Sequence, residues 1–514
     1  MPQDKASNLD AGEVKRLLVR DGSLAKVAIV AKKVTTTRVG SAVRGSRRVR
    51  AVVIVTALAA GAYVLWSPAP LAYDTAYALV WGRQILNGHV PDYTAVGAPT
   101  PHPLLTAFGV LSALTGEHAY TLFVLAGCLF WAVLLYAIVR LGDALGSVAG
   151  GFAAATSLAA SGIFDSLGVT GDKDVPYVAL LVGATTLEVR SRRSGVPVLS
   201  ALGLAGLIRP EAWLLSAVYW LYLTRSASTT RRLVTLAIVA AAPIIWALAD
   251  VAVTGNPAYS FTHTRGFTVA LDRRTGLHGV DWVLGHELPG ILTWPVLIGG
   301  AATIAWAALR RQRTLLVPSV VAVLAALTFA LQGITGLAVS GRLLLALATM
   351  LALLFAMGVV TWIQRRGEPG GRPAAVLGMV AVIVTLAALP GRERRLVDIR
   401  RSTQVEGRAY HDLRDFMSSS SGARLRLCPK VILPLFAENA GAEIPYVAYS
   451  MYHGGADRIS ISSAGPEGLL LERPESEIAR ESQFPEAVTH GLVSPPSFMA
   501  VGNNTTWAAW VRGC

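Results

Sequence analysis

The sequence predicts an all-α polytopic membrane protein of about eleven transmembrane helices, followed by a small mixed α/β domain at the carboxyl end. Of its 514 residues, 53% are hydrophobic and only 15% are charged, whereas a soluble globular protein carries about 25% charged residues. The apolar residues form long uninterrupted blocks, which are typical of membrane spans rather than of amphipathic soluble helices. After Pro390 these blocks end and the density of charge rises, which indicates a separate domain.

The net charge of +14 would suit a nucleic-acid-binding protein. However, Lys and Arg mostly flank the apolar blocks, where the positive-inside rule places them, so we expect no nucleic-acid partner. The three cysteines lack a CxxC spacing, which argues against a zinc or iron–sulfur site. The first apolar block begins only near Ala51, and nothing before it resembles a cleavable signal peptide.

Three regions are predicted along the chain. Residues 1–50 are polar and basic, and we expect a cytoplasmic arm that sets orientation and contacts anionic lipid. Residues 51–390 are expected to form the transmembrane domain, and residues 391–514 an extracytoplasmic domain. Every predicted inner loop carries Arg, which places the amino terminus in the cytoplasm. The bias towards Ala, Gly, Val and Arg is typical of a high-GC genome and favours a bacterial plasma membrane.

Each predicted span is an apolar run that ends beside charged residues. The spans cover residues 51–67, 119–139, 144–163, 175–189, 196–208, 212–223, 233–253, 288–309, 315–331, 343–363 and 373–389. The fifth and sixth form a hairpin of two short arms, near the lower limit for spanning. Residues 104–115 are too few to span and are predicted to lie as a helix on the outer face.

The segments between and after the spans are predicted from composition. Residues 255–286 are expected to form a polar outer loop. In the carboxyl-terminal domain, alternating and β-branched segments between turns favour strands, at residues 425–428, 431–436, 444–450, 458–462 and 507–512.

The first outer loop is the most informative stretch of the chain. Asp74 follows the first span by a few residues and begins a short helix, and a Pro-rich bend around His102 leads back into apolar sequence. A simple anchor needs no acid at the membrane surface, whereas an enzyme that acts on a lipid-borne substrate does. The structural alternative is that Asp74 caps the helix at 75–86, because Asp is a favoured N-cap residue.

Ionisable residues within or beside spans are costly and are therefore candidates for function. In the predicted topology they gather at the outer ends of spans from separate parts of the chain. The members are Asp74, Arg83, Asp92, His102, Asp165, Asp172, Lys173, Asp174, Arg209, Glu211, Asp250, Arg265 and Arg342. Carboxylates and fixed cations in one cleft suit transfer to a hydroxyl from a phosphate leaving group. The carboxylate accepts the proton, and Lys or Arg stabilises the departing phosphate.

Structural explanations stay open for these residues. Simple solvation explains three acids at span ends equally well: Asp92, Asp165 and Asp250. A local ion pair at the hairpin tip would account for Arg209 and Glu211, and snorkelling to lipid headgroups for Arg342. Residues 172–174 would then be a charged turn that caps the fourth span.

This pattern resembles the GT-C superfamily of membrane glycosyltransferases, which use polyprenyl-phosphate sugars, and within it the mannosyl- and arabinosyltransferases. The resemblance covers most of residues 50–390 in architecture. The features that carry it are Asp74 after the first span, the helix with Trp81 and Gly88, the re-entry at 99–103, the acid-bearing start of the fourth span at 172–176, and the hairpin tip at 207–211.

The resemblance implies transfer of one sugar from a polyprenyl-phosphate carrier to a cell-envelope glycan, glycolipid or protein on the outer face. It implies that Asp74 is the general base of a direct, inverting transfer, and that Lys173, Arg209 and Arg342 grip the lipid phosphate. The other substrate-binding candidates are His102, Asp172, Asp174, Glu211 and Arg265.

The sequence also departs from the family. The first loop lacks the DxD of many members, so we expect no metal cofactor. The DxD form of residues 172–174 leaves a divalent ion open there. Nothing matches the WWD-type signature of oligosaccharyltransferases.

Two other classes of function share part of this pattern. A transporter or flippase for a lipid-linked precursor also needs cations near the membrane, but transporters commonly bind at the midplane and contain inverted repeats, whereas the sequence shows no repeat. A non-enzymatic scaffold would tolerate Asp74→Ala.

Cys428 and Cys514 both fall in the predicted outer domain. On an oxidising side of the membrane they are expected to pair, and the alternative is two unpaired thiols. Cys128 lies within the second span, where packing explains it.

Overall fold

The computed structural model describes residues 48–512 apart from residues 96, 226–227, 271, 368–370, 429–430, 434–443, 453–458, 462–467 and 473–498. The chain divides into two units between Leu58 and Ala59, and the second, Ala59–Cys514, contains nearly all of the described residues. Among the described residues, five helices are long and apolar enough to cross a membrane, or up to eight if each sharply bent pair is one span. The chain is therefore a multi-pass membrane protein. Most of the predicted arm at 1–50, as well as Cys514, lies outside the described residues.

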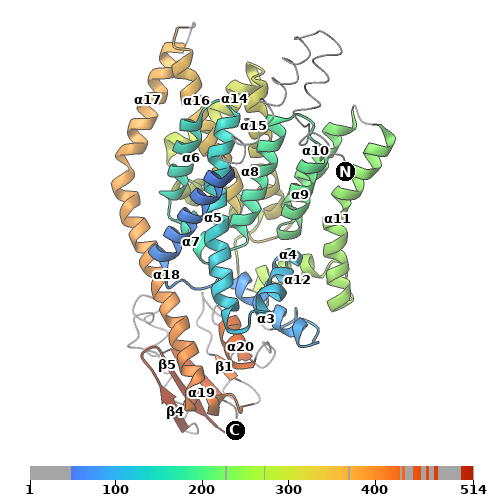
Figure 1. Ribbon diagram of the computed structural model, residues 1–514, viewed down its shortest axis with the longest axis vertical. Coiled ribbons are helices and arrows are strands. Elements are labelled where there is room, and N and C mark those ends of the chain that lie inside the picture. Colours follow the sequence, from blue (N-terminus) through green and yellow to red (C-terminus); the bar gives the residue numbers. More distant parts are fainter. Residues whose placement is uncertain are drawn as a thin grey trace, which may run out of the picture. The chain divides into compact units, whose positions relative to one another are not determined.

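Most predicted spans are helices with nearly the predicted bounds (Figure 1). They are the helix Arg48–Trp66, α5 (Ala119–Ala144), α8 (Asp174–Arg190), α9 (Val196–Ile208), α10 (Glu211–Thr224), α11 (Thr229–Thr254), α15 (Arg313–Ile334), α16 (Leu345–Gln364) and α17 (Gly371–Ala387). The prediction of eleven spans includes short apolar runs, such as those that form α9 and α10. α16 is the most enclosed long helix and packs against α6, α14, α15 and α17.

Sharp bends lie near the ends of two predicted spans. The third, 144–163, covers α6 (Val148–Ala159) and ends where α7 (Ile163–Val169) begins, and these helices meet at 77°. Gly162 lies between them with φ 74°, a conformation that glycine adopts without steric cost. The eighth, 288–309, covers the last turn of α13 (Gly276–Ile291) and all of α14 (Trp294–Leu309), and these helices meet at 109°.

The predicted outer loop at 255–286 is largely helical, because it contains α12 (Tyr259–Ala270) and most of α13. α13 buries Val280, Val283 and Leu288 on one side. Polar residues on its other side hid this helical period in the sequence.

The carboxyl-terminal region is mixed α/β, as predicted. α18 (Leu389–Ser418) is one long helix that continues from α17 towards the sheet (Figure 1) and is followed by α19 (Ser420–Leu425) and α20 (Ile444–Tyr452). The five-stranded sheet has the order β2-β1-β3-β5-β4. Its strands are β1 (Val431–Leu433), β2 (Ile459–Ile461), β3 (Gly468–Glu472), β4 (Met499–Asn503) and β5 (Trp507–Val511). β1 pairs in parallel with β2 and β3, and β5 pairs antiparallel with β3 and β4.

Two of the predicted strands do not form. Residues 425–428 fall at the end of α19 and just after it, and residues 444–450 form most of α20. α20 packs against α3 and α18 and buries Val447 and Tyr449. Tertiary packing thus overrides the strand preference of these aromatic and β-branched residues. The domain boundary at 390 stays a prediction, and α17 and α18 are bent by 45° close to it.

A close crossing of two helices fixes the position of the first loop. α3 (Tyr73–Leu86) and α4 (Pro103–Ala113) pack through a pair of glycines. A Cβ on Gly109 would lie 2.0 Å from the carbonyl oxygen of Ala78, and one on Gly82 would lie 2.3 Å from the carbonyl carbon of Gly109. Both contacts are with backbone, so a side chain at either position forces the helices apart.

We therefore expect Gly109→Ala to lower the melting temperature and to reduce activity, because α3 carries Asp74. Overpacking of this kind costs about 1–3 kcal/mol. The matched control is Gly183→Ala in α8, where a new Cβ meets nothing within 4 Å; it should leave stability unchanged or raise it slightly. Thermal melting of both variants in detergent measures the difference, and equal melting temperatures would contradict the tight crossing.

Candidate active site

Asp74 lies at the start of α3, where the first loop contacts the loop that precedes α8. The amide of Ala72 donates to the carbonyl of Thr170 at 2.8 Å, and the Thr75 hydroxyl donates to the carbonyl of Gly171 at 2.8 Å. The N-cap residue of α3 is Ala72, and Asp74 lies within the first helical turn. The capping explanation for Asp74 is therefore wrong, and its carboxylate, 7% exposed, points to other partners.

Two cations hold this carboxylate. The Lys173 ammonium donates to Oδ2 of Asp74, and Nη1 of Arg342 lies 3.5 Å from the same oxygen. Nη1 of Arg342 also lies 3.8 Å from Oδ2 of Asp172. Lys173 is buried, whereas the Arg342 side chain is 40% exposed. Arg342 is thus the cation of this pair that an incoming ligand can reach.

Asp74, Lys173, Arg342 and Asp172 form a first ionic group, and a second ionic group adjoins it. Arg209 pairs with Asp174 and, through Nη2 at 2.6 Å, with Oε1 of Glu211. The local ion pair considered for the hairpin tip is therefore present. Gln332 donates to Oε1 of Glu211 at 2.6 Å. Sequence reasoning missed Gln332, although a lone amide at the end of an apolar run was a usable signal.

The two ionic groups are joined through the backbone. The amide of Asp174 donates to Oδ1 of Asp172 at 2.8 Å. One turn thus presents Asp172 and Lys173 to the Asp74 side and Asp174 to the Arg209 side.

His102 precedes α4 and is buried. Its ring packs edge-to-face on Trp246 with centroids 5.5 Å apart, and its Nδ1 is a buried atom without a hydrogen-bond partner among the described residues. Burial, and next the charge of Lys173, lower the pKa of His102 well below its usual value, so the imidazole is neutral at physiological pH.

Asp74 and Asp172, the two carboxyls of the first ionic group, differ in proton affinity. Burial alone would raise the pKa of Asp74, but the charges of Lys173 and then Arg342 outweigh it and hold that pKa below its usual range. Burial, followed by the nearby carboxylate of Asp174, raises the pKa of Asp172 to about 6. A pair of acids whose pKa values are pushed apart is typical of a site that moves protons.

The other ionisable residues predicted at the outer ends of spans have separate contacts. Arg265 is exposed on α12 beside Gly336. The remaining partners are Thr94 for Asp92, the Trp131 indole for Asp165, Ser260 for Asp250, and the Tyr449 carbonyl and ring for Arg83. The idea that Asp165 and Asp250 are merely solvated is wrong, because both are buried.

Among the described residues, no group of three or more His, Cys, Asp or Glu side chains has a geometry that could hold a metal ion. Cys428 is disulfide-bonded, and Cys128 is free and buried. Cys514 lies outside the described residues, so its pairing with Cys428 stays a prediction.

Comparisons with known proteins bear on the fold. No family model and no curated protein sequence matches the chain. ArnT from Cupriavidus metallidurans, in a crystal structure with bound undecaprenyl phosphate, is similar over 89% of this chain and 97% of its own, with 14% identity and a TM-score of 0.50. The apo oligosaccharyltransferase of Archaeoglobus fulgidus is similar over 80% of this chain and 64% of its own, with 10% identity and a TM-score of 0.47. A many-helix membrane domain that leads into a mixed carboxyl-terminal region is thus shared with ArnT over nearly its whole length, and the chain has the GT-C fold.

Proposed function

We propose that the chain is an integral membrane glycosyltransferase that transfers one sugar from a polyprenyl-phosphate carrier to a cell-envelope glycan, glycolipid or protein. The observation that carries the proposal is the buried Asp74 carboxylate, which contacts Lys173 and a half-exposed Arg342. The undecaprenyl phosphate bound to ArnT supports the class of donor. The Arg-rich inner loops support a site on the outer face of the membrane.

In the proposed reaction, a hydroxyl oxygen of the acceptor forms a bond to the anomeric carbon of the donor sugar. The bond between that carbon and the phosphate oxygen breaks, and its electron pair leaves with the polyprenyl phosphate. Asp74 takes the hydroxyl proton as general base. A single displacement of this kind inverts the anomeric centre. Lys173 and Arg342 stabilise the charge that develops on the leaving phosphate.

The ion pairs of the free protein suggest how the base is activated. While Lys173 and Arg342 neutralise Asp74, its carboxylate is a weak base, because its pKa is lowered. A donor phosphate competes with Asp74 for the same two cations. When Lys173 and Arg342 bind the phosphate instead, Asp74 stays buried but loses the positive charges that stabilise its carboxylate. The proton affinity of Asp74 therefore rises. Donor binding thereby prepares the base for the acceptor.

Arg209 has a different place in this proposal. Its guanidinium is buried between Asp174 and Glu211, and a phosphate would have to break both pairs to reach it. We therefore assign the phosphate to Lys173 and Arg342, and we assign Arg209 to holding the turn at 172–174.

The test uses purified protein in nanodiscs, a panel of radiolabelled polyprenyl-phosphate sugars and a membrane extract as the source of acceptors. Label transfer that depends on the protein is expected, and it should disappear in Arg342→Gln. Asp281→Asn is a matched control for loss of an exposed charge. If no label is transferred but the same protein, reconstituted in lipid vesicles, moves labelled lipid across the bilayer, the chain is a flippase and the proposal is wrong.

The raised pKa of Asp172 gives a pH dependence for donor binding. Protonation of Asp172 below about pH 6 removes a negative charge close to Arg342, so an anionic phosphodiester should bind more tightly as the pH falls through 6. A rise of this pKa by one unit on binding corresponds to about 1.36 kcal/mol, or about tenfold in affinity. Isothermal titration of a polyprenyl-phosphate sugar at pH 5 and pH 7.5 measures the effect. Asp172→Asn should abolish it, and a pH dependence that persists in this variant would assign it to another group.

A further inference from the structure

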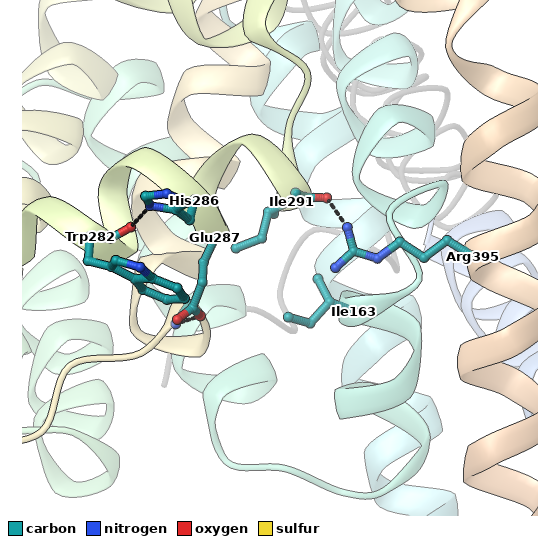
Figure 2. Close-up of a pocket in the computed structure, with 8 residues that line it drawn as sticks. Ile163, Trp282, His286, Glu287, Ile291 and Arg395 are labelled. Atoms are coloured by element: carbon teal, nitrogen blue, oxygen red, sulfur yellow. Dashed lines mark hydrogen bonds between the residues drawn. The ribbon is translucent and has the colours of Figure 1, made fainter. Parts of the chain in front are cut away.

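A cavity of about 200 Å³ lies between α13, α7, α18 and the 3-10 turn η2 (Gly341–Leu344) (Figure 2). Its wall includes Trp282, His286 and Glu287 from α13, Ile163 from α7 and Arg395 from α18. The volume equals that of about six or seven waters in the liquid, which is room for a ring-sized ligand but not for a lipid chain.

The wall has both a carboxylate and a guanidinium. Figure 2 shows Glu287 and Arg395 on different sides of the cavity, with Ile163 and Ile291 between them. Oε2 of Glu287 accepts a hydrogen bond from the Gly341 amide, and Oε1 has no protein partner among the described residues. A bare anion would be repelled by Glu287, and a bare cation by Arg395. A neutral polyhydroxyl ligand fits both, because its hydroxyls can donate to a carboxylate and accept from a guanidinium.

The aromatic side of the cavity is held in place. His286 stacks on Trp282 with centroids 4.8 Å apart and an interplanar angle of 12°. The guanidinium of Arg274 lies 3.7 Å from the centroid of the same indole ring. Apolar walls at Ile163 and Ile291 suit the C–H faces of a sugar ring. Of the polar groups around them, Nη1 of Arg395 donates to the Gly290 carbonyl at 2.9 Å, which positions the guanidinium at the edge of the cavity.

The cavity is linked to Asp74 through one short turn. Glu287 holds the amide of Gly341, and the next residue, Arg342, has its Nη1 3.5 Å from Oδ2 of Asp74. A Cβ at position 341 would lie 2.4 Å from Oε2 of Glu287, so the close approach of turn and carboxylate requires glycine. A ligand in the cavity therefore contacts the turn η2, which contains Arg342.

We propose that this cavity is a binding site for a sugar residue of the acceptor, oriented by Glu287 and Arg395. The assignment to the acceptor rests on the proposed function, because the cavity adjoins Gly341 and the next residue, Arg342, contacts the proposed base Asp74. The capacity to bind a neutral sugar ring rests on the cavity alone.

The test is binding of the full-length protein in detergent to an array of immobilised oligosaccharides, with folding checked by thermal melting. Ile163→Phe should fill the cavity and abolish binding without touching a polar group. Glu287→Gln keeps an acceptor for the Gly341 amide but removes the charge, and it should weaken binding about tenfold, because hydrogen bonds to charged groups are the stronger ones. Asp281→Asn, an exposed acid on the same helix, should bind as wild type.

Failure of this inference can be told apart from failure of the proposed function. If wild type binds no saccharide, or if Ile163→Phe binds as well as wild type, the cavity is not a sugar site. If binding follows the expected pattern but no polyprenyl-phosphate sugar is consumed, the sugar site stands and the glycosyltransferase proposal falls. If both hold, Glu287→Gln should raise the KM for the acceptor rather than the KM for the donor. A change in donor KM instead would overturn the assignment to the acceptor.

Discussion

Asp74→Asn is expected to lower the rate of sugar transfer by about 10²- to 10⁴-fold, which is the usual contribution of a general base. The same variant is expected to bind polyprenyl phosphate more tightly than the wild-type protein does. The two effects have one cause. The carboxylate that would accept the proton also neutralises Lys173 and Arg342 in the free protein. An amide of the same shape cannot accept the proton, and it leaves both cations available to the phosphate.

The measurement pairs a transfer assay with a lipid-phosphate binding assay on the same nanodiscs. Asp92→Asn is the matched control in the same loop, because the Asp92 side chain contacts Thr94 and should be dispensable for transfer. Weaker phosphate binding by Asp74→Asn would contradict the proposed competition. Equal transfer by Asp74→Asn and wild type would move the base elsewhere, with Asp172 the next candidate.

Arg209→Gln should produce the largest loss of stability. Arg209 is buried between the carboxylates of Asp174 and Glu211. Removing one partner of a buried ion pair leaves the other charges uncompensated and costs about 3–5 kcal/mol. Since the same residues tie the hairpin tip to the start of α8 and, through Gln332, to α15, the loss should appear as a marked fall in melting temperature and in folded yield.

The control for Arg209 is Arg265→Gln, which removes an exposed Arg on α12 and should change the melting temperature little. A second variant separates structure from ligand binding. Arg209→Gln combined with Asp174→Asn and Glu211→Gln removes the unpaired charges and should recover part of the lost stability. If instead Arg209→Gln melts like wild type and fails only to bind polyprenyl phosphate, Arg209 belongs to the phosphate site, as the family resemblance implies.

Much of the fold follows from local sequence. Long apolar blocks bounded by Arg predict most membrane helices within a few residues, because backbone groups in lipid must be satisfied within a helix. The bends were not predictable in this way. The apolar run at 144–163 gives no sign of a bend, but at its end the left-handed Gly162 turns the chain from α6 into α7. In the same way, α20 has a composition that favours a strand and becomes a helix because α3 and α18 cover it.

The same distinction between local sequence and tertiary structure applies to the candidate site. The sequence by itself determined that acids and cations gather at the ends of spans, because charge is excluded from the apolar blocks. Only the tertiary structure decided that Lys173 and Arg342 share Asp74, that Arg209 is enclosed by Asp174 and Glu211, and that Glu287 holds the turn before Arg342. Lys173 is 99 residues from Asp74 and Arg342 is 268. Pairings at such separations depend on how helices cross, at contacts such as Gly82 on Gly109, and no local pattern encodes a crossing.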